Sequence, residues 1–68
     1  MSKETDFFIY LLEGYAESKG ESSRDVLNEW QKRDLIDKIY DMYDLYHIER
    51  LENAYEDIDK LINEDLDK

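Results

Sequence analysis

The sequence contains no cysteine, no proline and only two glycines among its 68 residues. Without cysteine the chain has no disulfide and no thiolate-bound metal, a composition that fits a reducing cytosol. Without proline, no position forbids a helix. The longest apolar run, residues 7–12, is far too short to cross a bilayer, and the acidic start does not resemble a secretory signal. We therefore expect a cytoplasmic protein without a membrane-spanning segment.

Positive charge is also scarce, with nine Lys and Arg residues against 19 Asp and Glu, so the net charge is −10. The acids are concentrated in residues 34–68, which hold twelve acids and four bases, whereas residues 1–33 hold seven and five. Such a surface repels nucleic-acid backbones and most anionic membranes, and it attracts basic protein surfaces. The sequence therefore predicts a protein partner with a basic surface, no direct nucleic-acid binding and no membrane binding.

Apolar residues recur three and four positions apart along the chain, which predicts an all-α protein. A hydrophobic content of 41% is too high for a disordered acidic tail. We predict one helical domain, residues 1–68, that forms a compact bundle of three to four short helices. Residues 1–5 and 64–68 are expected to fray. Because so small a core gives modest stability, a homodimer stays open as an alternative.

The first predicted helix covers residues 6–19 and ends at Gly20, which can adopt a left-handed conformation. Ser22 and Asp25 resemble a capping box that opens a second, short helix, in which Trp30 is the largest core candidate. The apolar face of the first helix consists of Phe8, Leu11, Leu12, Tyr15 and Ala16.

A third helix is predicted from Asp34, as its cap, to Tyr46, and a fourth over residues 51–63. On one continuous helix the apolar residues of these two segments would face opposite sides, so we expect a turn at residues 47–50. The core side of the third helix consists of Leu35, Ile36, Ile39, Met42, Tyr43 and Tyr46, and we also assign Tyr55 to the core.

One histidine offers a candidate chemical site. Tyr40 and His47 lie on the border between the core and the acidic face of the third helix, with Asp44 beside them. Asp44 could orient His47 for proton transfer, or the two could ligate a metal. A lone histidine near a helix C-terminus more often bonds the last carbonyl groups, and the chain has no second histidine, no cysteine and no phosphate-binding glycine loop. We therefore predict no enzyme activity, no metal and no cofactor.

The carboxylates of the second half offer a binding surface instead, although a merely solvated acidic face is an equal alternative. This predicted acidic track consists of Asp37, Asp41, Asp44, Glu49, Glu52, Glu56, Asp57 and Asp59. Tyrosines off the apolar stripes can serve as anchors because they combine a flat apolar ring with a polar tip, although a core too small to cover all its rings is an equal alternative. The residues predicted to contact a partner are Tyr10, Asp37, Tyr40, Asp41, Asp44 and His47.

Several short motifs at fixed spacing carry a family resemblance. They are Glu13-x-Tyr15-Ala16, Ser22-x-x-x-Val26 with an aromatic residue at Trp30, Leu35-Ile36-Asp37, Tyr43-Asp44-x-x-His47 and Glu56-Asp57-Ile58-Asp59. With them the chain resembles, without gaps over residues 8–62, a small family of uncharacterised helical proteins of Firmicutes and their mobile elements. Members of that family usually carry leucine at position 46 and glycine at position 50.

The resemblance implies no activity, but genes of that family often lie beside one for a predicted ADP-ribosyltransferase-like toxin. This implies an antitoxin-like or toxin-associated protein that occludes a basic partner surface. Two alternatives remain open: a phage or mobile-element inhibitor that imitates nucleic acid and blocks a host defence protein, and a self-associating structural module.

Overall fold

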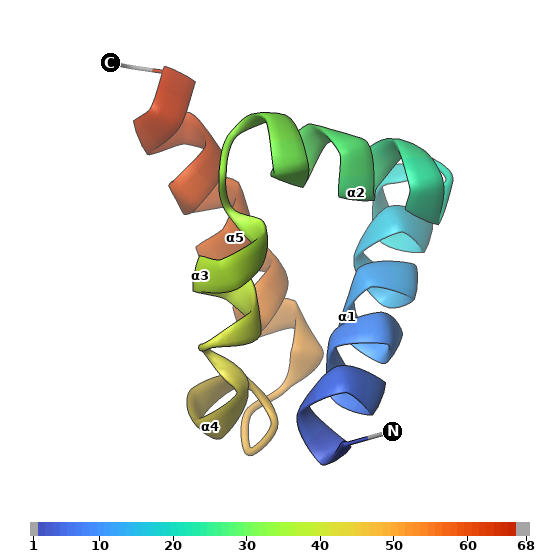
Figure 1. The fold of residues 1–68 in the computed structure, drawn as a ribbon, viewed down its shortest axis with the longest axis vertical. Coiled ribbons are helices and arrows are strands. Elements are labelled where there is room, and N and C mark those ends of the chain that lie inside the picture. The colour runs from blue at the N-terminus through green and yellow to red at the C-terminus, as the bar shows by residue number, and fades with distance from the viewer. Residues whose placement is uncertain (1, 67–68) are drawn as a thin grey trace.

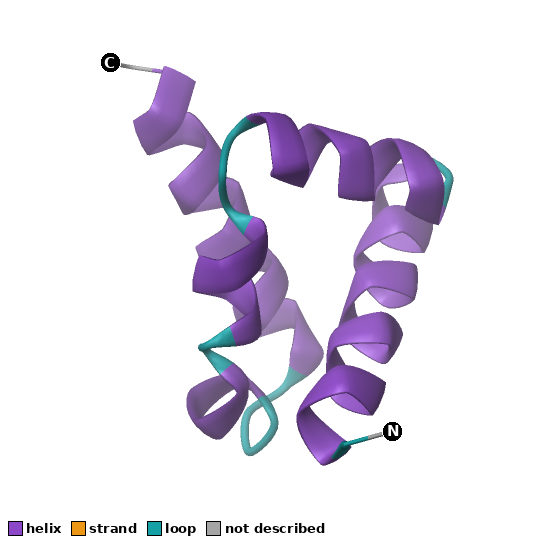
Figure 2. Cartoon of the chain, viewed as in Figure 1, coloured by secondary structure: helices purple, strands orange, loops and turns teal. Residues whose placement is uncertain are grey.

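The computed structural model describes residues 2–66, and this part of the chain forms five helices and no strand (Figures 1 and 2). The predicted all-α class is confirmed. The helices number five rather than three to four because the predicted third helix is divided in two. Their bounds are α1 Lys3–Lys19, α2 Ser23–Lys32, α3 Ile36–Tyr40, α4 Tyr43–Tyr46 and α5 Leu51–Leu66.

The helices enclose one core. In Figure 1, α2 crosses from the end of α1 towards α3, and α5 passes behind α3. The start of α1 lies near α4, where the Phe7 and Tyr43 rings meet edge to face. Within residues 2–66 no helix is both long and apolar enough to cross a membrane.

The ends of the first two helices follow local chemistry. The Ser2 side chain caps α1 by accepting the backbone N–H of Thr5, so α1 begins three residues before the predicted start. Gly20 ends α1 in the left-handed conformation, as predicted. Ser22 caps α2 by accepting the backbone N–H of Asp25, which confirms the predicted cap.

The terminal segments that we expected to fray belong in part to helices. Residues 3–5 form the start of α1, and residues 64–66 form the end of α5. Met1 and residues 67–68 lie outside the described residues.

The predicted helix over residues 34–46 is wrong in two respects. Asp34 is not a helix cap, because it adopts a left-handed conformation with φ 58° in the link between α2 and α3. A turn at Asp41 and Met42 then separates α3 from α4. Contacts with α1 accompany the bend, since Tyr40 packs against Phe8 before it and Tyr43 packs against Phe7 after it.

The predicted turn at residues 47–50 is confirmed, because α4 ends at Tyr46 and α5 begins at Leu51. Among the residues that the structure describes, Asp34 is the only non-glycine residue with positive φ. The resembling family carries glycine at the position of Arg50. Arg50 does not adopt a left-handed conformation here.

The core surrounds Trp30, whose side chain is 0% exposed. Phe8 and Tyr15 pack on the indole with ring centroids 5.9 and 5.5 Å away. Five residues that we expected in the core are only half-buried, namely Phe8, Ile36, Met42, Tyr43 and Tyr55. Most predicted core residues are confirmed, and Ala54 joins them, so that the buried set is Leu11, Leu12, Tyr15, Ala16, Val26, Trp30, Leu35, Ile39, Tyr46, Ala54 and Ile58.

Replacing Trp30 with alanine is expected to lower the free energy of unfolding by about 3–5 kcal/mol, because it leaves a large cavity under α1. Urea titration followed by circular dichroism measures this change. Tyr10→Ala serves as the control, since Tyr10 is 61% exposed and its removal should cost less than about 1 kcal/mol. Similar losses in both variants would show that Trp30 does not hold the core together.

Candidate protein-binding surfaces

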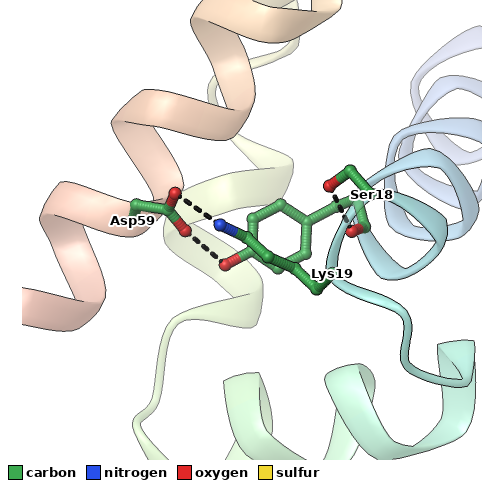
Figure 3. Close-up of polar contacts among 4 residues, drawn as sticks. Ser18, Lys19 and Asp59 are labelled. Atoms are coloured by element: carbon green, nitrogen blue, oxygen red, sulfur yellow. Dashed lines mark hydrogen bonds and ion pairs between the residues drawn. The ribbon is translucent and has the colours of Figure 1, made fainter.

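A polar cluster joins the end of α1 to α5 (Figure 3). The Tyr15 hydroxyl donates to Asp59 Oδ1 at 2.6 Å, and Lys19 Nζ donates to Asp59 Oδ2 at 2.7 Å. Although partial burial raises the pKa of Asp59, the hydrogen bonds from Lys19 and Tyr15 outweigh it and lower this pKa below its usual range. Burial and the bond to Asp59 also raise the pKa of the Tyr15 hydroxyl. Asp59 is therefore a structural contact and not a free member of the predicted acidic track.

A second cluster ties α2 to the end of α5. The Arg33 guanidinium contacts Glu29 Oε1 at 2.6 Å and Asp65 Oδ2 at 2.9 Å. Its side chain is more shielded from solvent than either carboxylate. Part of the negative charge of the chain is therefore paired with a cation of the same chain.

Stability should depend on the ionisation of Asp59. Because its folded-state pKa lies below that of the unfolded chain, the ionised carboxylate contributes stability that is present above about pH 4. This contribution is lost as the pH falls through the folded-state pKa. We expect the stability difference between wild type and Asp59→Asn to be full at pH 7 and to shrink at pH 3 in urea titrations.

The matched control is Glu56→Gln, since Glu56 is exposed and makes no side-chain hydrogen bond or ion pair within residues 2–66. Its difference from wild type should stay small at both pH values. If the stability difference between wild type and Asp59→Asn does not change between pH 7 and pH 3, the ionised Asp59 carboxylate does not stabilise the fold.

The acidic face consists of Asp37, Asp41 and Asp44. All three are exposed, and within the described part of the chain none forms an ion pair or a side-chain hydrogen bond. They lie on two short helices and the turn between them rather than on one helix. Their charges are thus available to a partner.

Two exposed apolar side chains that follow Asp44 in the sequence were not predicted as surface residues. Leu45, in α4, is 43% exposed, and Ile48, in the turn after it, is 73% exposed. The sequence did indicate that both side chains would be exposed, because Leu45 lies off the predicted apolar stripe and Ile48 lies in the predicted turn. Ile9, Tyr10 and Leu66 are the other large apolar or aromatic residues that are exposed in the described part of the chain.

Tyr40, predicted as an anchor, is engaged within the chain. It is half-buried, its hydroxyl is hydrogen-bonded to the Thr5 hydroxyl at 2.9 Å, and its ring centroid lies 5.7 Å from that of Phe8. Tyr40 therefore joins α3 to the start of α1. Its predicted contact with a partner stays a prediction.

His47 is exposed and caps the end of α4. Its ring stacks on Tyr43 with centroids 4.2 Å apart, and Nδ1 lies 2.6 Å from the Tyr43 carbonyl oxygen. Because a carbonyl oxygen can only accept, Nδ1 carries the proton. Asp44 makes no hydrogen bond to this ring in the described structure, and no group of three potential metal ligands gathers anywhere in residues 2–66. The imidazole thus bonds the carbonyl of the residue that begins α4.

An open groove of about 420 Å³ lies between α1 and α5. Tyr10 is exposed on the α1 side, whereas Tyr55 is half-buried on the α5 side. No basic residue lines this groove, whose lining consists of Tyr10, Glu13, Gly14, Glu17, Ser18, Leu51 and Tyr55. Of the predicted contact residues, Tyr10 thus lies apart from those of α3 and α4.

Gly14 is the residue that lets Tyr55 approach α1. A Cβ atom at Gly14 would overlap the Tyr55 hydroxyl, whereas it would lie at an ordinary 3.4 Å from the ring carbon Cζ. A glycine in the middle of a predicted helix was the sequence signal for this close approach.

Gly14→Ala is expected to lower the free energy of unfolding by up to about 2 kcal/mol, because the steric cost exceeds the gain in helix propensity. In a Tyr55→Phe background the overlapping atom is gone, and the same change should stabilise the protein by about 0.8–1.0 kcal/mol. A double-mutant cycle by urea titration measures the sign reversal. The same effect of Gly14→Ala in both backgrounds would show that the hydroxyl does not contact Gly14.

The fold and its surfaces define a small acidic all-α domain with a charged face and an aromatic groove. Residues 6–65 match the family described as "Protein of unknown function (DUF3791)". The chain therefore belongs to this family, for which no activity is assigned. Comparison with curated proteins and with solved structures gave no match.

Proposed function

We propose that this protein binds another protein that has a basic surface, and that the acidic face of Asp37, Asp41 and Asp44 makes the contact. The observation that supports this most directly is that all three carboxylates are exposed and uncompensated within the described residues. By contrast, Glu29, Asp59 and Asp65 are neutralised by ion pairs inside the fold. An excess of unpaired negative charge attracts a cationic surface at long range.

Charge alone gives little affinity, since exposed ion pairs contribute about 0–1 kcal/mol each. Leu45 and Ile48, which are exposed and follow Asp44 in the sequence, provide apolar area that a partner can bury. The acids then steer and orient the partner, and the apolar side chains hold it.

The partner that we propose is a toxin-type enzyme, because the family resemblance associates such proteins with an ADP-ribosyltransferase-like toxin. Binding would cover a basic surface of that enzyme and block access to it, an antitoxin-like mechanism. The same carboxylates would also suit imitation of a nucleic-acid backbone, and the identity of the recovered partner distinguishes the two.

Affinity purification of the full chain from the native host, followed by mass spectrometry, should recover a protein with a basic surface. Asp37→Lys/Asp41→Lys reverses two charges on the acidic face and should abolish recovery. Raising the salt from about 0.05 to 0.5 M should also weaken binding to the wild type, because exposed charges are screened.

The matched control is Glu56→Lys/Glu64→Lys, which changes the net charge equally at two exposed positions outside the acidic face. It should retain most of the partner. Equal losses in both double variants, with circular dichroism showing intact helices, would mean that net charge alone drives the association. Retention of the partner by Asp37→Lys/Asp41→Lys would show that the acidic face is not the contact.

A further inference from the structure

We propose that the groove between α1 and α5 receives an arginine side chain of the partner protein, with Glu13 and Glu17 facing the guanidinium beside Tyr10 and Tyr55. This inference rests on the proposed function in that the partner is a basic protein. It uses a different surface, so the two can fail separately.

The lining of the groove favours a cation. Glu13 and Glu17 are exposed, and neither forms an ion pair or a side-chain hydrogen bond within residues 2–66. Two smaller hollows beside α5 differ in this respect, because Lys38 and Lys60 line one of them and Arg33 and Lys38 line the other. The α1–α5 groove therefore combines unpaired acids with no base of its own.

The spacing of these acids suits a guanidinium group. Glu13 and Glu17 lie four residues apart on α1, so their side chains project from adjacent turns on the same side of the helix. Gly14 lies between them in the sequence and lets the Tyr55 side chain approach α1 beside the two carboxylates. A planar guanidinium can contact both carboxylates, which a compact ammonium does less well.

The aromatic walls favour arginine further. Tyr10 is 61% exposed, and a guanidinium stacks well on a phenol ring. The Tyr55 hydroxyl makes no hydrogen bond in the described part of the chain. Burial first, and then the nearby Tyr10, Glu52 and Glu17, raise the pKa of this hydroxyl. The groove thus combines aromatic walls with a negative electrostatic potential.

A second copy of this chain is a poorer occupant. Each copy carries a net charge of −10, so two copies repel each other at long range. A basic segment of another protein brings the complementary charge instead.

The test is an NMR titration of the ¹⁵N-labelled full chain with the peptide acetyl-Leu-Arg-Leu-amide. We expect saturable shifts of the Glu13, Gly14, Glu17 and Tyr55 amides, with half-saturation on the order of millimolar for so small a probe. The same peptide with citrulline in place of arginine has nearly the same shape but no charge. It should produce much smaller shifts.

Glu13→Gln/Glu17→Gln should weaken binding of the arginine peptide about fivefold, since it removes two exposed charge contacts. Glu56→Gln/Glu64→Gln makes the same charge change outside the groove and should leave the affinity within about a factor of two. Equal weakening by both variants would overturn the groove assignment.

Four other results would also overturn it. Equal shifts with the citrulline peptide would mean that the positive charge of the guanidinium is not recognised. Shifts that depend on protein concentration without peptide would identify a second copy as the occupant. Shifts confined to Asp37, Asp41 and Asp44 would overturn the groove while supporting the acidic face. If no shift saturates, the groove proposal fails, and the purification with Asp37→Lys/Asp41→Lys still decides the proposed function.

Discussion

Burial of the Trp30 indole is the interaction on which the rest of this structure depends. The indole is wholly enclosed, and the rings of Phe8 and Tyr15 from α1 lie against it. In so small a chain a single large ring supplies a substantial share of the apolar area that opposes conformational entropy. Its Nε1 has no hydrogen-bond partner among the described residues, so one polar group is buried at a cost that the packing of the ring must exceed.

The acidic residues fall into two groups with different physical roles. Asp59 and Asp65 are paired with cations and connect α5 to α1 and to the end of α2, whereas Glu29 pairs with Arg33 within the α2 segment. The carboxylates of the acidic face have no such partners in the described structure. The α1–α5 groove would add specificity to the long-range attraction of that face, because a groove selects shape and an acidic surface alone does not.

Much of the fold could be predicted from the sequence. The three- and four-residue spacing gave the helices and most of the buried residues, and the opposed apolar phases gave the turn before Leu51. The division of α3 from α4 could not be predicted, because no glycine or proline marks Asp41 and Met42. The tyrosines on either side of that turn contact α1, and local pattern carries no information about such distant contacts.

The candidate binding surfaces could likewise be predicted only in part from the sequence. Composition by itself determined that the surface is acidic and that Asp37, Asp41 and Asp44 would face solvent, since charge and helical periodicity are local properties. Only the tertiary structure decided that Tyr40 bonds Thr5, that Asp59 is neutralised by Lys19 and that Tyr10 and Tyr55 line one groove. Each of these contacts joins residues at least 35 positions apart, and packing of the helices around Trp30 brings them together.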